Sequence, residues 1–376
     1  MTEYLIALLP GDGIGPEVIG EARKVSERAA DLFGFSLKWE EFPFGASYYL
    51  EHRVVLPQSA LEDMAEGQAM LLGAVGDPRV KPGPLEQELL LALRFHFDQY
   101  MNLRPALSFP GVPTPVALPG GRRLDALVVR ENTEDLYMGI GGRGRGNLDQ
   151  ELKARRGLYE LAGNLSLKFS PGQEAAFALG LMTRPAIARI TRKAGELARA
   201  RGERKVFVIS KANAVPNLYG FWDEVSQETL AAEFPDLEAV SLNVDAICYL
   251  LPRQPLDYGV MLCPNLFGDI VSDLMSALAG GLGLAASGNI GDSLSMFEPV
   301  HGSAPTIAGT GRANPLAAIM SAAMLLRHIG QNQAAEAVEA AVGQYLQGPD
   351  KPFELGGQDP LTAVGDKVTA LLKAAA

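Results

Sequence analysis

Two aspartates stand four residues apart in the segment 264–273, whose sequence is PNLFGDIVSD. Apolar residues after Gly268 recur at helical spacing, so Asp269 should open a helix and Asp273 should lie one turn later on the same face. Two carboxylates on one face repel unless a cation lies between them, and Mg²⁺ or Mn²⁺ prefers oxygen ligands. The alternative is a helix cap at Asp269 and a solvated first-turn acid at Asp273.

Three arginines are expected at the ends of regular elements. Arg94 lies near the end of a helix predicted over residues 85–97, Arg104 follows a predicted strand, and Arg130 ends another. A guanidinium group can bind a carboxylate through two parallel hydrogen bonds, so these residues could hold a small polycarboxylate. The alternative is three ordinary surface arginines.

Four further residues could take part in chemistry. Tyr137 ends the run RENTEDLY, and Lys211 directly follows a predicted strand, where a lysine could act as a base between two lobes. Asp245 opens an apolar helix, so a helix cap is its alternative role. His301 begins a glycine-rich run whose small residues would let a flat ring or a pyrophosphate approach the backbone.

The elements that must position these residues alternate between strands and helices, which indicates an α/β fold. Strands are predicted at residues 4–9, 37–42, 69–73, 100–103, 126–129, 206–210, 237–242 and 258–263. Helices are predicted at 17–32, 85–97, 186–201, 218–233, 314–329, 333–346 and 360–374, and residues 154–165 could also be helical. Loops are predicted at 285–292 and 299–312. The run PGDGIGP at 10–16 matches GxGxxG only loosely, and a tight turn is the alternative.

Length and charge narrow the classes of protein. The 376 residues suit two lobes, residues 1–98 plus 254–376 and residues 99–253, with an arm at about 140–182 that could pack on a second subunit. A formal net charge of −11 argues against nucleic acid or an anionic membrane as a partner, and no apolar run is long enough to span a bilayer. Cys248 and Cys263 are predicted to be buried free thiols, which favours the cytoplasm.

Six motifs occur in a fixed order: PGDGIGP at 10–16, NLRP at 102–105, RENTEDLY at 130–137, SKAN at 210–213, NLFGDIVSD at 265–273 and EPVHGSAP at 298–305. In this order the chain resembles the β-decarboxylating dehydrogenases, a family of isopropylmalate, isocitrate, homoisocitrate and tartrate/D-malate dehydrogenases. The resemblance implies the two-domain isopropylmalate dehydrogenase-like fold with a mixed sheet, not a Rossmann fold. It also implies a homodimer whose active sites take residues from both subunits.

The same resemblance implies metal-dependent oxidative decarboxylation of a 3-substituted (R)-malate, a hydroxy-dicarboxylate, with hydride transfer to NAD. Arg94, Arg104 and Arg130 would hold the carboxylates, and Asp245, Asp269 and Asp273 would bind Mg²⁺ or Mn²⁺, with Asp245 also at the substrate. Lys211 would be the base and Tyr137 the general acid, and the second subunit would supply Lys211 and Asp245. His301, Gly302, Ser303, Ala304, Pro305, Thr306 and Asn314 would hold the cofactor.

In the family that the chain resembles, the helix before Arg94 sets the substrate's third substituent, and here the signals for that substituent conflict. Leu90 and Leu91 form an apolar wall that favours an alkyl group, as in 3-isopropylmalate. FDQYMNLRP at 97–105, PGVPTP at 110–115 and IGGR at 140–143 are similar to the tartrate/D-malate branch, whereas SGNIGD at 287–292 is similar to the homoisocitrate branch. Those substrates and isocitrate stay alternatives, and a catalytically silent binding subunit is the alternative outside enzymes.

Cofactor choice and the arm are the remaining departures from the family pattern. Thr306 stands where NAD-using relatives carry an aspartate that repels a 2′-phosphate, so NAD is predicted and NADP stays possible. The segment 149–181 is longer than the matching arm of isopropylmalate enzymes. We expect its extra helix either to clasp the second subunit or to be an idle insertion.

Overall fold

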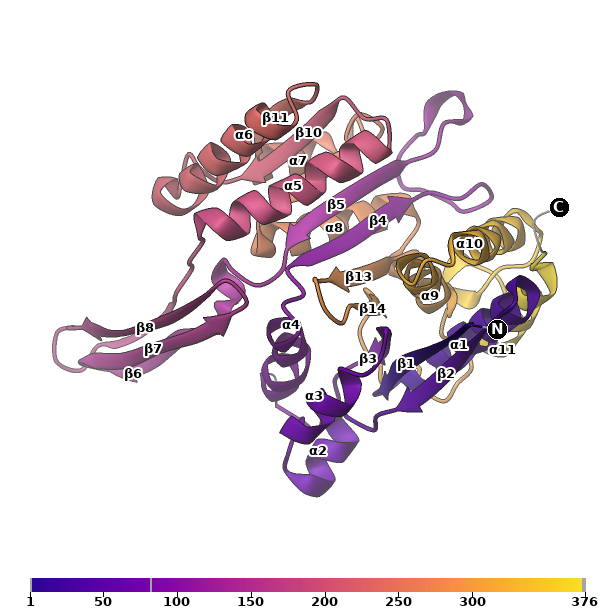
Figure 1. Ribbon diagram of the computed structural model, residues 1–376, viewed down its shortest axis with the longest axis horizontal. Coiled ribbons are helices and arrows are strands. Elements are labelled where there is room, and N and C mark those ends of the chain that lie inside the picture. Colours follow the sequence, from indigo (N-terminus) through magenta and orange to yellow (C-terminus); the bar gives the residue numbers. More distant parts are fainter. Residues whose placement is uncertain (1, 82, 374–376) are drawn as a thin grey trace.

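A mixed sheet of ten strands runs through the molecule (Figure 1), whose computed structural model describes residues 2–81 and 83–373. The strands are β1 (Thr2–Gly11), β2 (Phe35–Glu41), β3 (Ala69–Ala74), β4 (Met101–Leu107), β5 (Asp125–Glu131), β10 (Lys205–Ser210), β11 (Glu238–Asn243), β12 (Val260–Cys263), β13 (Ala286–Ile290) and β14 (Met296–Pro299). Their spatial order is β11-β10-β12-β5-β4-β13-β14-β3-β1-β2. The strands at each end of the sheet pair in parallel. In the middle, β4 pairs antiparallel with β5 and β13, and β13 pairs antiparallel with β14. The predicted α/β class and mixed sheet are therefore confirmed.

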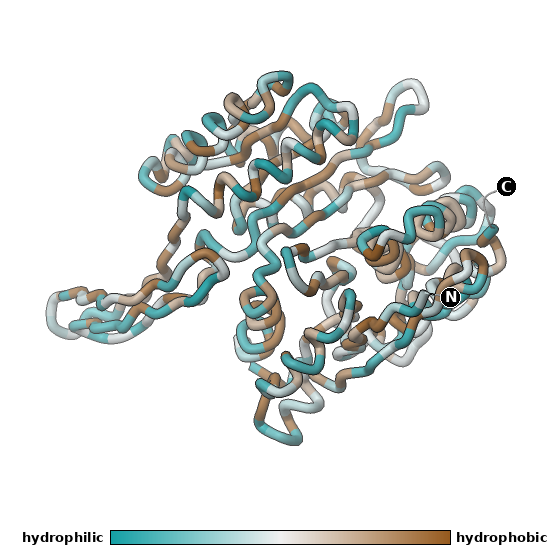
Figure 2. The backbone as a smooth tube through the Cα atoms, viewed as in Figure 1, coloured by the Kyte–Doolittle hydropathy of each residue, from teal (hydrophilic) through white to brown (hydrophobic). Residues whose placement is uncertain are grey.

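Helices cover both faces of the sheet at each end. They are α1 (Gly15–Phe33), α2 (Ala46–His52), α3 (Gln58–Met64), α4 (Ala92–His96), α5 (Arg184–Ala200), α6 (Phe221–Glu233), α7 (Val244–Leu250), α8 (Asn265–Ala279), α9 (Leu316–His328), α10 (Asn332–Gln347) and α11 (Leu361–Leu371). Around β1 and β3, one face packs against α1, α9, α10 and α11, and the other against α2, α3 and α4. Around β10 and β12, α5 and α6 cover one face and α7 and α8 the other. Hydrophobic colours cover most of α9 in Figure 2, in agreement with its burial.

Shorter turns complete the described chain. The π-helical turns are η1 (Glu86–Leu91) and η4 (Pro216–Gly220), and the 3-10 turns are η2 (Pro119–Gly121), η3 (Leu136–Met138), η5 (Leu282–Leu284) and η6 (Phe353–Leu355). The predicted C-terminal helix ends at Leu371 here, and its predicted end, Ala374, lies outside the described residues.

Strand alternation decides which face carries the polar residues of interest. In β5, Leu127 and Val129 pack with α5, whereas Ala126 and Val128 pack with α8, because successive side chains point to opposite faces. Arg130 continues the second series and therefore points toward α8. By the same rule Arg104 in β4 shares that face, so both arginines lie under one helix.

The predicted start of α8 was wrong. The helix begins at Asn265 with Pro264 in extended backbone as its N-cap, so Asp269 lies in the second turn rather than at the start. Gly268 is not a break but a contact, because an added Cβ would lie 2.6 Å from Cγ of Arg130. Because glycine has no side chain, the side chain of Arg130 can pack directly on the helix backbone at Gly268.

The predicted loop at 285–292 was also wrong, because residues 286–290 form β13. This strand pairs antiparallel with β4 on one side and with β14 on the other. Its polar residues Ser287 and Asn289 gave it the composition of a loop, yet both are buried. They face the same side of the sheet as Arg104, where they find hydrogen-bond partners.

The arm is built from strands, so the predicted helix at 154–165 and the extra helix within 149–181 were wrong. β7 (Leu148–Arg156) and β8 (Tyr159–Leu167) form one antiparallel hairpin, and β6 (Gly141–Arg145) pairs with β9 (Glu174–Ala178). Along β7 burial alternates residue by residue, which is the period of a strand and not of a helix. Figure 1 shows the arm projecting from the body.

The cores show how the two ends of the sheet are assembled. Residues of β12 and α8 share their cores with elements between residues 100 and 251. The predicted boundaries of the two lobes, at 98/99 and 253/254, stay a prediction.

Cys263 is fully buried and Cys248 only partly so, and both are free thiols. Among the described residues, none of the helices combines the length and apolar character needed to cross a membrane.

Candidate active site

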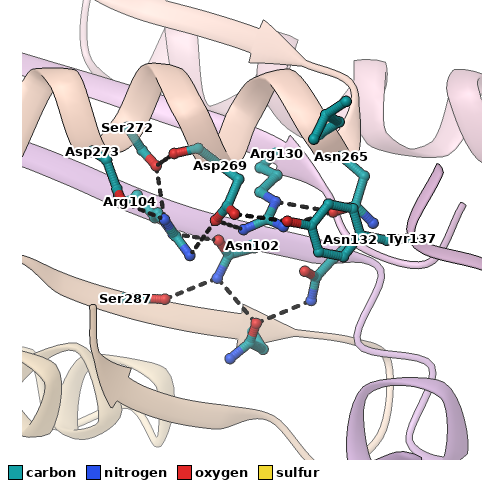
Figure 3. Close-up of polar contacts among 12 residues, drawn as sticks. Asn102, Arg104, Arg130, Asn132, Tyr137, Asn265, Asp269, Ser272, Asp273 and Ser287 are labelled. Atoms are coloured by element: carbon teal, nitrogen blue, oxygen red, sulfur yellow. Dashed lines mark hydrogen bonds and ion pairs between the residues drawn. The ribbon is translucent and has the colours of Figure 1, made fainter. Parts of the chain in front are cut away.

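Two of the three predicted arginines converge on the acidic face of α8 (Figure 3). Arg130, which is 1% exposed, donates from Nη1 to Oδ1 of Asp269 over 2.5 Å, and from Nε and Nη2 to Oδ1 of Asn265. Arg104 lies 3.1 Å from Oδ1 of Asp269 through Nη2, and its Nη1 donates to Oδ1 of Asp273 over 3.3 Å. Asp269 is therefore shared by both guanidinium groups.

These ion pairs set the protonation of the acids. Burial raises the pKa of Asp269, but Arg130 and then Arg104 outweigh it and hold this pKa below its ordinary value. Burial, followed by the charge of Arg104, lowers the pKa of Arg130 to about 9, which leaves it charged at neutral pH. Burial raises the pKa of Asp273, which has only one close cationic partner. The helix therefore presents an ionised carboxylate at Asp269 to any incoming cation.

Tyr137 joins the same cluster from η3. Its hydroxyl donates to Oδ2 of Asp269 over 2.9 Å, and the guanidinium carbon of Arg130 lies 5.1 Å from its ring centroid. Burial, then the Asp269 carboxylate, raises the pKa of Tyr137, so the phenol keeps its proton. A protonated phenol beside Arg130 could deliver a proton.

A cavity of about 180 Å³ opens beside this cluster and is lined by Leu90, Arg94, Arg104, Glu298, His301 and Gly302, together with residues of β3 and β14. Leu90 thus borders it, whereas Leu91 does not. Arg94 donates from Nη2 to Oε1 of Glu298 over 3.0 Å, and its buried Nε has no hydrogen-bond partner among the described residues. A buried guanidinium that lines a cavity and keeps a donor without a partner suits a ligand carboxylate.

The cavity lined by the predicted site residues is not the most voluminous one in the described structure. Hollows of about 680 Å³ beside α10 and about 580 Å³ between α5 and α9 are larger, yet neither is lined by a predicted site residue. We assign the smaller cavity because charged and unpartnered buried groups converge there.

The helix that carries Leu90 and Arg94 has an unusual turn. The predicted helix at 85–97 is confirmed, but residues 86–91 are π-helical and only 92–96 are α-helical. Such turns are rare and often lie at functional sites. The wider turn places Leu90 at the cavity while Leu89 stays fully buried in the core.

A chain of amides connects two of the arginines, and the sequence analysis missed it. Glu298 accepts from Nδ2 of Asn289 over 2.7 Å, and Oδ1 of Asn289 accepts from Nδ2 of Asn102 over 3.0 Å. Oδ1 of Asn102 in turn accepts from Nε of Arg104 over 2.8 Å. Since Glu298 also holds Arg94, four hydrogen bonds join Arg94 to Arg104. The available signal was Asn102 inside an apolar strand sequence, whereas Asn289 lies in a segment with the composition of a loop.

The glycine-rich loop after β14, which the resemblance implied as the cofactor loop, begins next to the cavity. His301 and Gly302 line the cavity, and Nε2 of His301 is buried with no partner among the described residues. Burial lowers the pKa of His301, so the ring is neutral at pH 7. Ser303 is buried, and an added Cβ at Gly13, whose φ is +58°, would lie 2.0 Å from its carbonyl oxygen. The run at 10–16 is thus a tight turn packed on this loop.

The other predicted cofactor residues do not line the cavity. Ala304 is half-buried, Pro305 and Thr306 are exposed, and Asn314 is buried. The amide of Asn314 donates to Glu354 over 3.0 Å and accepts from the backbone N–H of Leu316, so the protein already uses both of its polar groups.

Lys211 and Asp245 form a separate pair within the chain. Nζ of Lys211 lies 2.5 Å from Oδ1 of Asp245, and this hydrogen bond lowers the pKa of Asp245. Within residues 2–81 and 83–373, no three His, Cys, Asp or Glu side chains are close enough together to hold a metal ion. The structure therefore joins Asp269 with Asp273 but does not bring Asp245 to them in one chain.

Comparison with known proteins identifies the class. The family model described as isocitrate/isopropylmalate dehydrogenase matches residues 5–368. Two relatives named 3-isopropylmalate dehydrogenase are 41% identical (Thermobifida fusca, 96% of each chain covered) and 43% identical (Clavibacter sepedonicus, 91% of this chain and 90% of the relative). The solved isocitrate dehydrogenase from Methylococcus capsulatus has a TM-score of 0.83 at 32% identity, with 99% of each chain covered. A solved β-decarboxylating dehydrogenase from Thermococcus kodakarensis has a TM-score of 0.72 at 32% identity, covering 98% of this chain and 96% of that one.

The chain therefore belongs to the isocitrate/isopropylmalate dehydrogenase family. This membership confirms the resemblance carried by the six motifs and the fold that it implied. It also implies an oxidoreductase that acts on a small dicarboxylate with a pyridine nucleotide and a divalent metal ion.

Proposed function

We propose that this chain oxidatively decarboxylates 3-isopropylmalate with NAD and Mg²⁺ or Mn²⁺, as a homodimer in the cytoplasm. One observation carries the proposal: a cavity that combines the apolar side chain of Leu90 with Arg94 and Arg104 and borders the His301–Gly302 loop. Two carboxylates of a malate suit the guanidinium groups, and an alkyl group at C3 suits the leucine. The names of the relatives at 41% and 43% identity support the same substrate.

The residues present fit both cofactors. Asp269 and Asp273 offer carboxylate oxygens on one helix face, a donor set that suits a hard divalent cation completed by substrate and water oxygens. Asp245 would complete that set from a second subunit, together with Lys211. The buried Nε2 of His301 has no partner among the described residues, so it could form a hydrogen bond with a cofactor bound along the loop. When bound, the cation polarises the 2-hydroxyl and the nicotinamide accepts hydride from C2.

The protein's own groups then have distinct tasks. Arg94, Arg104 and Arg130 fix both carboxylates, so that the C2 hydrogen faces the cofactor. Lys211 of the second subunit removes the proton of the 2-hydroxyl. The oxidised acid carries a carboxylate β to its new carbonyl and loses CO₂ from C3, which leaves the electron pair on the enolate. Tyr137 donates its proton to C3, and the product is a 2-oxo acid.

The decisive experiment measures NADH and CO₂ formation with 3-isopropylmalate, D-malate, tartrate, isocitrate and homoisocitrate. We expect the highest kcat/KM with 3-isopropylmalate. Preference for D-malate or tartrate would move the chain to that branch, and no turnover of any of the five would refute the proposal. Lys211→Ala should keep substrate binding and lose turnover, whereas a silent binding subunit would show no turnover before the change either.

The metal assignment has its own test. Asp269→Asn and Asp273→Asn should both raise the Mn²⁺ concentration that gives half-maximal activity, because each removes a charged oxygen ligand. Calorimetric Mn²⁺ titration in the presence of substrate gives a second readout. If both variants kept normal activity in a chelator, the two carboxylates would serve only Arg104 and Arg130.

A further inference from the structure

The inner turn of the arm returns to the body of the molecule beside the candidate site. β7 ends at Arg156 and β8 begins at Tyr159, so residues 157 and 158 form the turn between them. An added Cβ at Gly157 would lie 2.3 Å from a carboxylate oxygen of Asp98, which lies two residues after the end of α4, the helix that carries Arg94. Only a glycine allows the turn to approach this closely. The hairpin is therefore docked at its inner end, although its strands project outward (Figure 1).

Arg156 makes the contacts that fasten this turn. Its Nε donates to the carbonyl oxygen of Thr133 over 2.8 Å, and its Nη2 donates to the carbonyl oxygen of Met138 over 2.9 Å. These two carbonyls lie on either side of Tyr137, so one guanidinium ties both ends of the segment that carries this tyrosine. The planar guanidinium group of an arginine holds its N–H donors in fixed directions, so it can bridge two carbonyl oxygens better than the single ammonium group of a lysine.

The same guanidinium also contacts the helix that carries Arg94. Its central carbon lies 3.5 Å from the ring centroid of Phe95, the residue after Arg94. A guanidinium stacked on an aromatic face gains cation–π attraction and fills space on the ring. Arg156 thus touches the supports of two predicted substrate-contacting residues, although it lies outside the cavity itself.

Two buried acids lie near the guanidinium without forming an ion pair with it. Burial lowers the pKa of Arg156, while the carboxylates of Glu131 and Glu134 raise it. Glu131 is the last residue of β5, and Glu134 lies between it and Tyr137. A cation from the arm therefore faces an acidic pocket in the body, and the neighbouring Arg155 points away from it, since its side chain is 86% exposed.

We propose that Arg156 is a positioning residue through which the arm sets the geometry of the Tyr137 segment and of the Arg94 helix. The inference rests on the proposed function for its effect on turnover, but not for the docking itself. Tyr137 would act after substrate has bound, so its displacement lowers kcat. Displacement of Arg94 weakens the hold on a carboxylate and raises KM.

Three variants and a matched control test this role. Arg156→Ala removes the bridge, Arg156→Lys keeps the charge without the fork, and Gly157→Ala pushes the turn away from Asp98 while Arg156 stays. Arg155→Ala removes a neighbouring arginine whose side chain pairs only with the exposed Glu160 among the described residues. We expect Arg156→Ala to lower kcat about tenfold or more and to raise KM several-fold, because small misplacements of reacting groups cost this much. Arg156→Lys should recover part of the loss, and Arg155→Ala should stay within about twofold of the unchanged protein.

Hydrogen exchange measured by mass spectrometry gives a readout that needs no turnover. Arg156→Ala and Gly157→Ala should speed exchange in peptides covering residues 131–138 and 92–98, and Arg155→Ala should not. Unchanged exchange in both peptides would overturn the docking role. Unchanged kcat and KM alongside faster exchange would overturn the positioning role and leave Arg156 as a purely structural contact. If the unchanged protein turned over none of the five hydroxy acids, the proposed function would fail while exchange still decided the docking.

Discussion

A buried carboxylic acid next to the Tyr137 segment should make the protein lose stability as the pH rises. Glu134 is 1% exposed, and its two carboxyl oxygens accept from the backbone N–H and the hydroxyl of Thr183, each over 2.8 Å. Burial, followed by the charge of Glu131, raises the pKa of Glu134 from 4.5 to about 7. The folded protein therefore holds this proton more tightly than the unfolded chain does.

The sign and size of the effect follow from proton linkage. Between pH 4.5 and about 7 this carboxyl group binds its proton more in the folded state than in the unfolded state, so its contribution to stability falls across this range and changes no further above it. The pKa rise corresponds to about 3 kcal/mol of unfolding free energy. Glu134→Gln should remove this slope, because the amide oxygen accepts from the N–H of Thr183 and the amide nitrogen donates to its hydroxyl.

Urea unfolding followed by tryptophan fluorescence, at several pH values from 4.5 to 8, measures the effect, and Trp222 is a fully buried reporter. The variant should gain stability relative to the unchanged protein as the pH rises, by up to about 3 kcal/mol. Glu228→Gln is the control, since its side chain is 58% exposed and pairs with Arg184 at the surface. Parallel stability curves for Glu134→Gln and the unchanged protein would refute the reasoning.

Three further predictions concern the cavity and its surroundings. Asn289→Asp places a second carboxylate against Glu298, so kcat/KM should fall about tenfold or more as the pH rises from 5.5 to 8, and a flat profile would contradict the amide chain. Thr306→Asp should raise the NAD/NADP ratio of kcat/KM about tenfold, or 1.4 kcal/mol, mainly by worsening NADP; an unmoved ratio would show that the loop runs elsewhere. Gly268→Ala should cost about 1–3 kcal/mol in thermal unfolding, because the new methyl group would lie 2.6 Å from Arg130, and an unchanged melting temperature would argue against that contact.

The sequence predicted most of the fold because its regular elements follow simple periodicities. The strand before Asp269, the helix at 186–201 and the mixed sheet agree with the prediction. The errors fell where polar residues are buried or where a strand is long and half-exposed. β13 looked like a loop because Ser287 and Asn289 are polar, and only their buried partners on β4 and β14 explain them as strand residues.

The candidate site was predicted in part, since spacing can reveal a pair of residues on one helix but not contacts between distant segments. The pairing of Asp269 and Asp273 with Arg104 agrees with the predicted helix face. The amide chain through Asn289 and the docking of Arg156 could not be predicted, because each joins strands or turns far apart in the sequence. No local sequence pattern indicates either the amide chain or the docking of Arg156.

The order of strands in the sheet has a consequence for how the chain folds during synthesis. β3 and β4 are consecutive in the sequence of these ten strands, yet β13 and β14 lie between them in space. Those two inner strands leave the ribosome about 180 residues after β4, which takes roughly 10–40 s at bacterial and eukaryotic elongation rates. During that interval the facing edges of β3 and β4 expose unpaired backbone groups, which invite pairing with other chains. The nascent protein is thus most prone to aggregate just before Glu298 arrives to complete both the sheet and the surroundings of Arg94.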